Sequence, residues 1–474
     1  MAGSRGIREI TMVPLVLAAL AGATLAGCDG AGNASAAPTS TVPPLTASGP
    51  AVSTPLAAGD WPTYHGDNAR TGFAGGLAPI GVPHQDWHST VDGAVYGQPL
   101  VVGSTVLAAT ENDTVYALDA ATGRVNWSTH VGTPVPQADL PCGDIDPLGI
   151  TGTMAYDPTT SRVFAVAEST GGAHTLVGLD VRTGAVVVRV ELEPPRGDRL
   201  AHQQRAALTV LAGRVYVAYG GLYGDCANYI GSVVSVTTAG VDPISYAVPT
   251  SREGGIWAPG GATVLSTPAG DTLLYSVGNG AAVTSGTGYD GSDAVQGLTP
   301  ALRTAGYFAP SSWADDNAGD LDLGSSGPTV LGPWVFIAGK RGDGYVLRAG
   351  SLGGIGGQVS QLPACRSFGG SAVADNTIYL PCPDGPRALT IDAAGTASVR
   401  WHAAVSAAGS PTVGGGAVWV VDYSAGVLYA LDPATGAVRA QVSLGPTPHF
   451  ASPTLSGSHA YVGTMTGVTS IAGA

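Results

Sequence analysis

The chain has 474 residues, a formal net charge of −14, 44% hydrophobic residues and only 11% charged residues. The acidic balance excludes a nucleic-acid-binding protein, which needs a basic surface, and it disfavours electrostatic adhesion to anionic lipid. The 71 glycines and 34 prolines imply many turns, so the composition favours an all-β protein of many short strands.

Residues 1–27 resemble a bacterial lipoprotein signal peptide. Arg5 and Arg8 form a short positive region, and the apolar stretch that follows is too short for a comfortable membrane span. It ends in Leu-Ala-Gly-Cys, which resembles a lipobox. We expect Cys28 to carry acyl chains and to anchor the protein to the outer face of the cytoplasmic membrane, or on the periplasmic side where an outer membrane exists. The alternative is an ordinary signal peptide with a chance cysteine.

Residues 28–58 are rich in Ser, Thr, Pro, Ala and Gly and carry almost no charge. Such a stretch cannot bury enough apolar surface to offset the entropy lost on ordering. We therefore expect a disordered tether, followed by a single domain over residues 59–474.

Four cysteines remain after Cys28, an even number that suggests two disulfides in an exported protein. Cys365 and Cys382 flank a strand–turn–strand stretch, which favours a local bridge. Cys142 and Cys226 then pair by elimination. The alternative is free buried thiols, and no Cys/His spacing predicts a metal site.

A hairpin motif recurs along the chain. Two clear copies read VYALDAATGRVNW and LYALDPATGAVRA, and two copies are weaker; they cover residues 115–127, 428–440, 176–188 and 388–401. In the first copy, Asp119 and Thr122 can cap the turn with side-chain oxygens, and Gly123 accepts a left-handed backbone. Trp127 lies on the returning strand.

A second unit precedes these hairpins, with two apolar strands joined by a Gly or Asp turn. Eight such units start between about residue 97 and residue 463, which indicates a solenoid or a β-propeller. The last unit, from Ala451, is too short for four strands, whereas His84–Val91 reads as a strand without a unit. A propeller closes its ring in this way, but a solenoid does not. We predict an eight-bladed β-propeller of four-stranded antiparallel blades, closed by an N-terminal strand, with Trp127 and Trp401 packed between blades.

These residues resemble the pyrroloquinoline-quinone (PQQ) type β-propellers. DWPTYHGDNARTGF, residues 60–73, is similar to the segment that precedes the blades in that family, and residues 115–127 are similar to its blade-locking repeat. The family holds both quinoprotein alcohol dehydrogenases and non-catalytic scaffold lipoproteins. The resemblance therefore implies the fold more specifically than the chemistry.

In the dehydrogenases of this family, Ca²⁺ and PQQ lie at the mouth of the channel. The resemblance places Asn279, in LYSVGNG, at the metal-binding asparagine and Lys340, in GKRGDGYVLRAG, at the cation that touches the quinone. Asp320 and Asp322, in GDLDLGSSGP, correspond to the segment of the catalytic aspartate. Asp225 lies near the second metal carboxylate, one place out of register.

Departures from the family pattern imply a degraded cofactor site. Val264 stands where the aromatic floor of the quinone is expected, and Gly319 replaces a tryptophan. The glutamate before an Arg-Gly pair and the disulfide between adjacent cysteines are missing. Ca²⁺ needs six to eight oxygen ligands, of which about three can be named. We therefore expect no tight binding of PQQ or Ca²⁺.

Three irregular segments combine aromatic residues with carboxylates or amides. They carry Trp257, Trp313, Tyr223 and Tyr229. If the segments gather on one face, they form a reasonable surface for sugars or peptides. The alternative is structural loops, with Trp257 and Trp313 in packing roles.

We expect a monomeric cell-envelope protein that binds a protein, peptide or glycan without catalysis and reaches the membrane only through its lipid anchor. The alternative is a PQQ- and Ca²⁺-dependent dehydrogenase of alcohols or sugars. A third possibility is a small-ligand sensor with another cofactor in the channel. Asn279, Asp320 and Lys340 favour the dehydrogenase only if they converge with an acidic group around a cavity.

Overall fold

The computed structural model describes Ser53, residues 55–406 and residues 409–474. The predicted signal peptide, the predicted acylation site at Cys28 and nearly all of the predicted tether lie outside these residues. No helix in the described part of the chain is long and apolar enough to cross a membrane.

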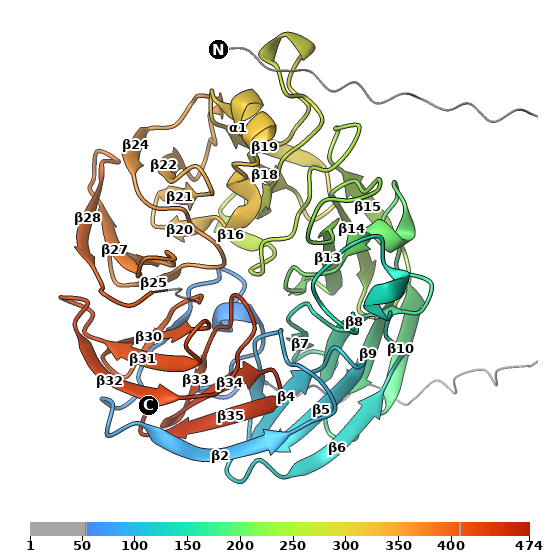
Figure 1. Cartoon of the computed structure of the whole chain (residues 1–474), viewed down its shortest axis with the longest axis vertical. Coiled ribbons are helices and arrows are strands. Elements are labelled where there is room, and N and C mark those ends of the chain that lie inside the picture. The colour runs from blue at the N-terminus through green and yellow to red at the C-terminus, as the bar shows by residue number, and fades with distance from the viewer. Residues whose placement is uncertain (1–52, 54, 407–408) are drawn as a thin grey trace, which may run out of the picture. The chain divides into compact units, whose positions relative to one another are not determined.

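Eight antiparallel sheets surround a common axis, each with its first strand innermost, as predicted (Figure 1). Blades 1 to 4 consist of β3 (Leu100–Val102), β4 (Thr105–Ala109), β5 (Thr114–Asp119) and β6 (Val125–His130); β7 (Ala155–Asp157), β8 (Arg162–Ser169), β9 (Ala173–Asp180) and β10 (Val186–Glu191); β12 (Thr209–Leu211), β13 (Arg214–Gly221), β14 (Ser232–Thr237) and β15 (Ile244–Ala247); β16 (Thr263–Thr267), β17 (Gly270–Val277), β18 (Ala294–Leu298) and β19 (Thr304–Ala309).

Blades 5 to 8 follow the same plan. They consist of β20 (Thr329–Leu331), β21 (Trp334–Ala338), β22 (Asp343–Arg348) and β24 (Ser360–Pro363); β25 (Ala372–Ala374), β26 (Thr377–Leu380), β27 (Arg387–Ile391) and β28 (Ala397–His402); β29 (Thr412–Gly414), β30 (Ala417–Asp422), β31 (Val427–Leu431) and β32 (Val438–Ser443); β33 (Thr454–Ser456), β34 (His459–Thr464), β35 (Gly467–Ala472) and β2 (His84–Thr90). Short additions are β1 (Phe73–Ala74), β11 (His202–Gln203), β23 (Gly354–Ile355), the helix α1 (Trp313–Gly319) and 3₁₀ turns at Tyr64–Gly66, Gln137–Asp139, Arg199–Ala201, Ser285–Thr287 and Leu323–Ser325.

The ring closes where the sequence predicts. Strand β2, from the N-terminal side, pairs antiparallel with β35, so that His84 lies opposite Ala472 and Thr90 opposite Gly467 (Figure 1). The last blade therefore takes its outer strand from the beginning of the domain. Pairing of this kind leaves no open end in the ring.

The segment of residues 60–74 runs across the centre of the ring and hydrogen-bonds to inner strands of several blades. Its backbone bonds are Trp61 N–H to Val101 O (2.7 Å), Tyr156 N–H to Pro62 O (2.8 Å), Val264 N–H to Asn68 O (2.7 Å), Val373 N–H to Thr71 O (2.7 Å) and Val413 N–H to Gly72 O (2.7 Å). These partners belong to blades 1, 2, 4, 6 and 7. The segment is thus a hub that joins blades far apart in the sequence.

Arg70 is the most extensively bonded side chain of this hub. Its guanidinium donates to the carbonyl oxygens of Ala262 (2.9 Å), Leu208 (3.0 Å) and Tyr64 (3.0 Å) and to the hydroxyls of Thr63 (2.6 Å) and Thr209 (2.8 Å). Burial lowers the pKa of Arg70 to about 10, which still leaves the group charged at neutral pH. One buried cation therefore satisfies acceptors from the hub and from blades 3 and 4.

Tryptophans of one blade pack against the predicted turns of the next blade. In the first turn, the Thr122 hydroxyl donates to Asp119 Oδ1 at 2.7 Å, and Gly123 has φ +69°. A Cβ atom on the turn glycines would meet a tryptophan of the preceding blade: Trp87 at Gly123 (2.6 Å), Trp127 at Gly184 (2.5 Å) and Trp401 at Gly436 (2.6 Å). The predicted packing of Trp127 and Trp401 between blades is confirmed.

Replacing Gly436 by alanine should lower the free energy of unfolding by about 2–4 kcal/mol, because a left-handed backbone and a clash with Trp401 add. The matched control is Gly457→Ala, since Gly457 has φ +60° and open space around the added Cβ. We expect the control to lose only about 1–2 kcal/mol in urea unfolding. Equal losses would show that the tryptophan contact contributes nothing.

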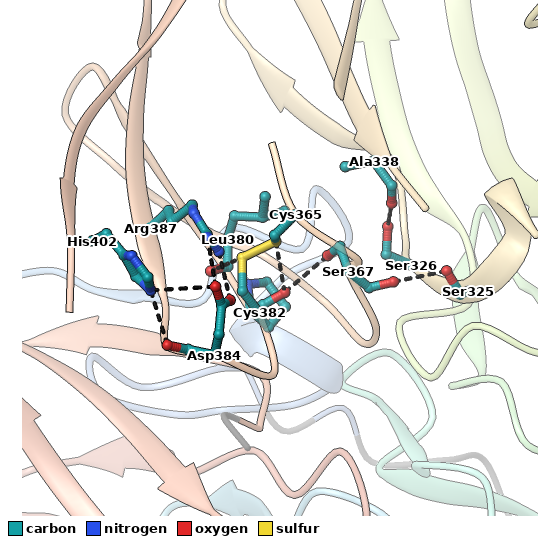
Figure 2. Close-up of a disulfide and its surroundings, with 11 residues drawn as sticks. Ser325, Ser326, Ala338, Cys365, Ser367, Leu380, Cys382, Asp384, Arg387 and His402 are labelled. Carbon is teal, nitrogen blue, oxygen red and sulfur yellow. Dashed lines mark hydrogen bonds and ion pairs between the residues drawn. A yellow bond between two sulfur atoms is a disulfide. The ribbon is translucent and has the colours of Figure 1, made fainter. Parts of the chain in front are cut away.

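Both predicted disulfides are present. Cys142–Cys226 joins residues 84 apart in the sequence, and Cys365–Cys382 joins residues 17 apart. Figure 2 shows the second bridge beside Ser367, whose hydroxyl donates to Pro381 O at 3.0 Å. Ser325 Oγ in turn donates to Ser367 O at 2.7 Å, so the bridge fixes a loop that blade 5 contacts.

Candidate functional site

An equivalent position before the inner strand of blades 1, 3, 6 and 8 carries a large side chain. Tyr96, Arg205, Phe368 and Phe450 each stand four residues before the inner strand of their blade. Phe450, before blade 8, lies with its ring centroid 6.4 Å from that of Trp257, before blade 4 on the opposite side of the ring. Side chains from opposite blades can meet only at the axis. We call Tyr96, Arg205, Trp257, Phe368 and Phe450, with the neighbouring Tyr423 and His449, the channel mouth.

Aromatic rings link the parts of the channel mouth. The rings of Phe368 and Phe450 are stacked, with their centroids 6.3 Å apart. The ring centroids of His449 and Tyr423 lie 4.7 Å apart. Phe450 has φ +65°, a left-handed conformation that a bulky residue rarely adopts. The surrounding structure therefore holds the ring at the axis against a local backbone cost.

Four residues that the family resemblance singles out converge beside Trp257. The ammonium of Lys340 lies 2.7 Å from Asp320 Oδ1 and 2.5 Å from Asp322 Oδ2. Asn279 donates from Nδ2 to Asp320 Oδ1 at 2.9 Å and from its backbone to Asp322 Oδ1 at 2.7 Å. Lys340 also lies 5.9 Å from the ring centroid of Trp257.

Lys340 neutralises part of the negative charge of this group, in which one ammonium faces two carboxylates. Burial lowers the pKa of an ammonium, but the carboxylates of Asp322 and Asp320 outweigh it and raise the pKa of Lys340. Asp322 is buried and Lys340 is nearly so, and the low local polarity strengthens their attraction. Lys340 therefore stays protonated and takes up negative charge that a metal ion would otherwise require.

Val264 and Trp257 lie in different surroundings. Val264 is buried in β16 and bonds to the hub, whereas Trp257 lies beside Lys340, with its indole nitrogen 3.3 Å from where a Cβ on Gly278 would lie. Trp257, expected from the sequence as a binding-loop aromatic, is therefore the aromatic residue next to Lys340.

The family resemblance implies Ca²⁺ and PQQ, and the donor set can be tested for fit. Asn279 Oδ1 is buried and accepts no hydrogen bond from the described part of the chain, which suits a cation. However, the carboxylates of Asp320 and Asp322 both bind Lys340. Nowhere in the described residues do three or more His, Cys, Asp or Glu side chains form a group that could hold a metal ion. The donor set therefore does not fit a calcium site.

Asp225 and Tyr229 lie at the edge of this group. Tyr229 is buried, and its hydroxyl donates to Asp225 Oδ1 at 2.6 Å. Glu253 forms backbone bridges to Ile230 and Gly280, and burial raises the pKa of its carboxyl, with Asp225 and Asp322 adding to the shift. The carboxylates of Asp225 and Asp322 therefore disfavour ionisation of Glu253. The three carboxyls do not form a group that could hold one metal ion within the described residues.

Two of the other expected binding aromatics differ sharply in exposure. Tyr223 is 73% exposed and can meet a ligand. Trp313 is 4% exposed and packs at the start of α1 against Tyr289, so it has the packing role. The sequence reasoning missed Arg205 and Phe450 altogether, although their spacing before β12 and β33 repeats that of Tyr96 before β3.

A second polar cluster lies buried between blades 1, 2 and 3. Glu111, Asp113, Glu168, His174 and Gln204 are each at most 2% exposed. Glu111 Oε2 accepts from Gly149 N–H at 2.8 Å, and Asp113 Oδ2 accepts from Ser169 at 3.0 Å. Burial raises the pKa of both Glu111 and Asp113 to about 7, and it raises that of Glu168 well above its ordinary value. The folded protein therefore holds these acids protonated at mildly acidic pH.

This cluster predicts that stability falls as the pH rises. A carboxyl whose pKa increases from 4.5 to about 7 on folding stabilises fully below pH 4.5, and that contribution is lost as the pH passes through 7. The glutamine in Glu111→Gln cannot ionise. As the pH rises from 4.5 to about 7, the free energy of unfolding of the variant should therefore increase relative to that of the wild type by about 1.4 kcal/mol per pH unit. Urea unfolding at several pH values measures the difference. Parallel curves for the two proteins would contradict the prediction.

Comparison with known proteins gives a family and several relatives. A family model described as outer membrane protein assembly factor BamB matches residues 84–285 and 313–472. The dehydrogenase subunit of a quinone alcohol dehydrogenase from Gluconacetobacter polyoxogenes is 25% identical over 216 residues, which cover 39% of this chain and 27% of that protein. The chain thus matches only about a quarter of the length of the curated relatives.

Solved structures share the fold at low sequence identity. Quinohemoprotein alcohol dehydrogenase from Comamonas testosteroni has a TM-score of 0.63 at 15% identity, with 88% of this chain and 81% of that chain covered. BamB from Moraxella catarrhalis has a TM-score of 0.58 at 16% identity, with 82% and 99% covered. At such identities the likeness shows the fold and leaves the chemistry open.

Proposed function

Because the chain belongs to the PQQ-type β-propeller family whose model is described as outer membrane protein assembly factor BamB, we propose that it is a non-catalytic binding or scaffold module of the cell envelope. Its ligand is a protein, peptide or glycan that meets the channel mouth and the loops around it. The blades supply a rigid ring, and the loops before the inner strands supply the contacts.

The observation that carries this proposal is the ion pair of Lys340 with two carboxylates. The family resemblance assigns Asp320 and Asp322 to positions near metal and quinone, but both carboxylates bind the lysine ammonium. A calcium ion would have to displace that ammonium and find further oxygen ligands. The group therefore supports a structural or ligand-positioning role at the mouth.

The test is reconstitution of the full chain with PQQ and Ca²⁺. After desalting, quinone absorbance and dye-linked oxidation of alcohols and sugars are measured, with an apo quinoprotein dehydrogenase treated identically as the positive control. We expect the control to retain quinone and turn over, and this chain to do neither. Stoichiometric quinone with turnover would overturn the proposal.

A second candidate is a PQQ-dependent dehydrogenase of alcohols or sugars. The convergence of Asn279, Asp320 and Lys340 beside Trp257 favours it, since the family resemblance assigns a role to each of these positions. The same reconstitution separates the two candidates, because only the dehydrogenase would turn over.

We also propose that the protein is exported and held at the membrane by acyl chains on Cys28. The lipobox-like residues 25–28 and the apolar stretch before them support this localisation. Labelling with a palmitate analogue should mark the wild type and spare Cys28→Ser, and label on the variant would refute acylation at this residue.

A further inference from the structure

Arg205 is a buried cation at the channel mouth, and most of its donors have no acceptor among the residues that the structure describes. The residue is 9% exposed, and burial lowers its pKa. Its guanidinium donates one hydrogen bond within the described residues, from Nη2 to His449 O at 3.2 Å. A guanidinium carries five N–H donors, so the rest of its hydrogen-bonding capacity is available.

No carboxylate of the described residues forms an ion pair with Arg205. Its largest electrostatic partner is Glu111, but that carboxyl accepts from Gly149 N–H (2.8 Å) and from the Thr151 hydroxyl (3.1 Å). Buried charges are ordinarily paired, since removing a charge from water is costly. Arg70, with five close acceptors, shows the usual arrangement in this same chain.

Aromatic faces surround the guanidinium. Its central carbon lies 5.2 Å from the ring centroid of Phe450 and 5.9 Å from that of Tyr96. Both rings are half-buried, so part of each meets solvent. An anion that binds Arg205 would therefore place its attached group against apolar surface.

We propose that Arg205 recognises a carboxylate attached to an apolar group, and that the channel mouth is the site where it binds. The inference rests on the proposed binding function and names the chemistry of its ligand. The planar fork of arginine suits a carboxylate, which it can bind through two parallel hydrogen bonds. Tyr96 and Phe450 contact the apolar part. The source is either a free organic acid or the C-terminus of a peptide with an apolar last residue.

The test is isothermal titration of the full chain with three probes: hydrocinnamate, acetyl-alanyl-phenylalanine with a free carboxylate, and the C-terminal amide of that peptide. We expect saturable binding of the carboxylates and none of the amide. Tighter binding of the peptide acid than of hydrocinnamate identifies a C-terminus as the source, and the reverse order identifies a free acid. Equal affinity for the peptide acid and its amide overturns the proposal.

Arg205→Gln should weaken carboxylate binding by about 10-fold or more, because a buried charged hydrogen bond is lost. Arg366→Gln is the matched control, since Arg366 is exposed two residues before Phe368 and should bind as the wild type does. Unchanged affinity in Arg205→Gln overturns the proposal. Quinone retention with turnover would refute the non-catalytic function, but it would leave the carboxylate titration intact, so the two failures are distinguishable.

Discussion

Replacing Arg70 by methionine should lower the free energy of unfolding by about 4 kcal/mol, because buried acceptors lose a charged donor together. Three carbonyl oxygens and two hydroxyls, from the hub and from blades 3 and 4, would be left without this partner. Methionine keeps most of the apolar stem, so the variant reports the bonds rather than a cavity. Urea unfolding followed by intrinsic fluorescence measures the loss.

The matched control is Arg182→Met. The Arg182 side chain is 65% exposed and pairs only with Asp180, at 3.6 Å, among the described residues. Exposed pairs contribute little, so we expect a change within about 0.5 kcal/mol. If Arg70→Met also stayed within that range, the hub would not join the blades energetically.

Removing the long-range disulfide should have an effect of similar size. Cys142→Ala with Cys226→Ala opens a loop of 84 residues, and the chain-entropy account gives a loss of about 4–4.5 kcal/mol. Cys365→Ala with Cys382→Ala opens a loop of only 17 residues, for which the same account gives about 3 kcal/mol. Thermal and urea unfolding of the two double variants should therefore rank in that order.

The reverse order would mean that local packing decides more than loop length. Cys142 borders a small apolar cluster with Leu140, Ile145, Leu148 and Leu222, whereas Cys382 is fully buried in the packing between blades 5 and 6. An unfolding measurement under reducing conditions separates the two contributions, since reduction opens the loops without truncating the side chains.

Much of the fold could be predicted because the residues of the repeat indicate the turns and strands that it forms. The glycines of the Asp-x-x-Thr-Gly turns adopt a left-handed backbone, and Trp127 and Trp401 each lie on the strand that follows a turn of their hairpin. The short last unit and the isolated strand at His84–Val91 predict the closure that β2 and β35 make. These features are local in sequence, so they can be recognised without a structure.

The candidate site was harder to predict because it is assembled across the ring. Lys340, Asp320 and Asn279 were found by resemblance, but their mutual pairing depends on how three loops meet. Trp257 was expected as a loop aromatic, but its position beside Lys340 depends on how the loops of different blades meet. Arg205 and Phe450 carry no motif, and only their equal spacing before inner strands marks them.

The buried acids illustrate a different limit. Glu111 and Asp113 look like solvated turn residues in TENDT, residues 110–114. Their burial arises because blade 2 and the loop at Gly149 cover the turn. A sequence alone does not reveal which turn a neighbouring blade will cover.

The central claim is that Lys340 satisfies the carboxylates of Asp320 and Asp322, so that the mouth binds ligands without a calcium-dependent cofactor. Isothermal titration of the full chain with Ca²⁺ tests it most directly. The account predicts no saturable binding up to about 1 mM, the weak end of known protein calcium sites. A one-to-one isotherm in the micromolar range that Asn279→Ala abolishes would contradict it.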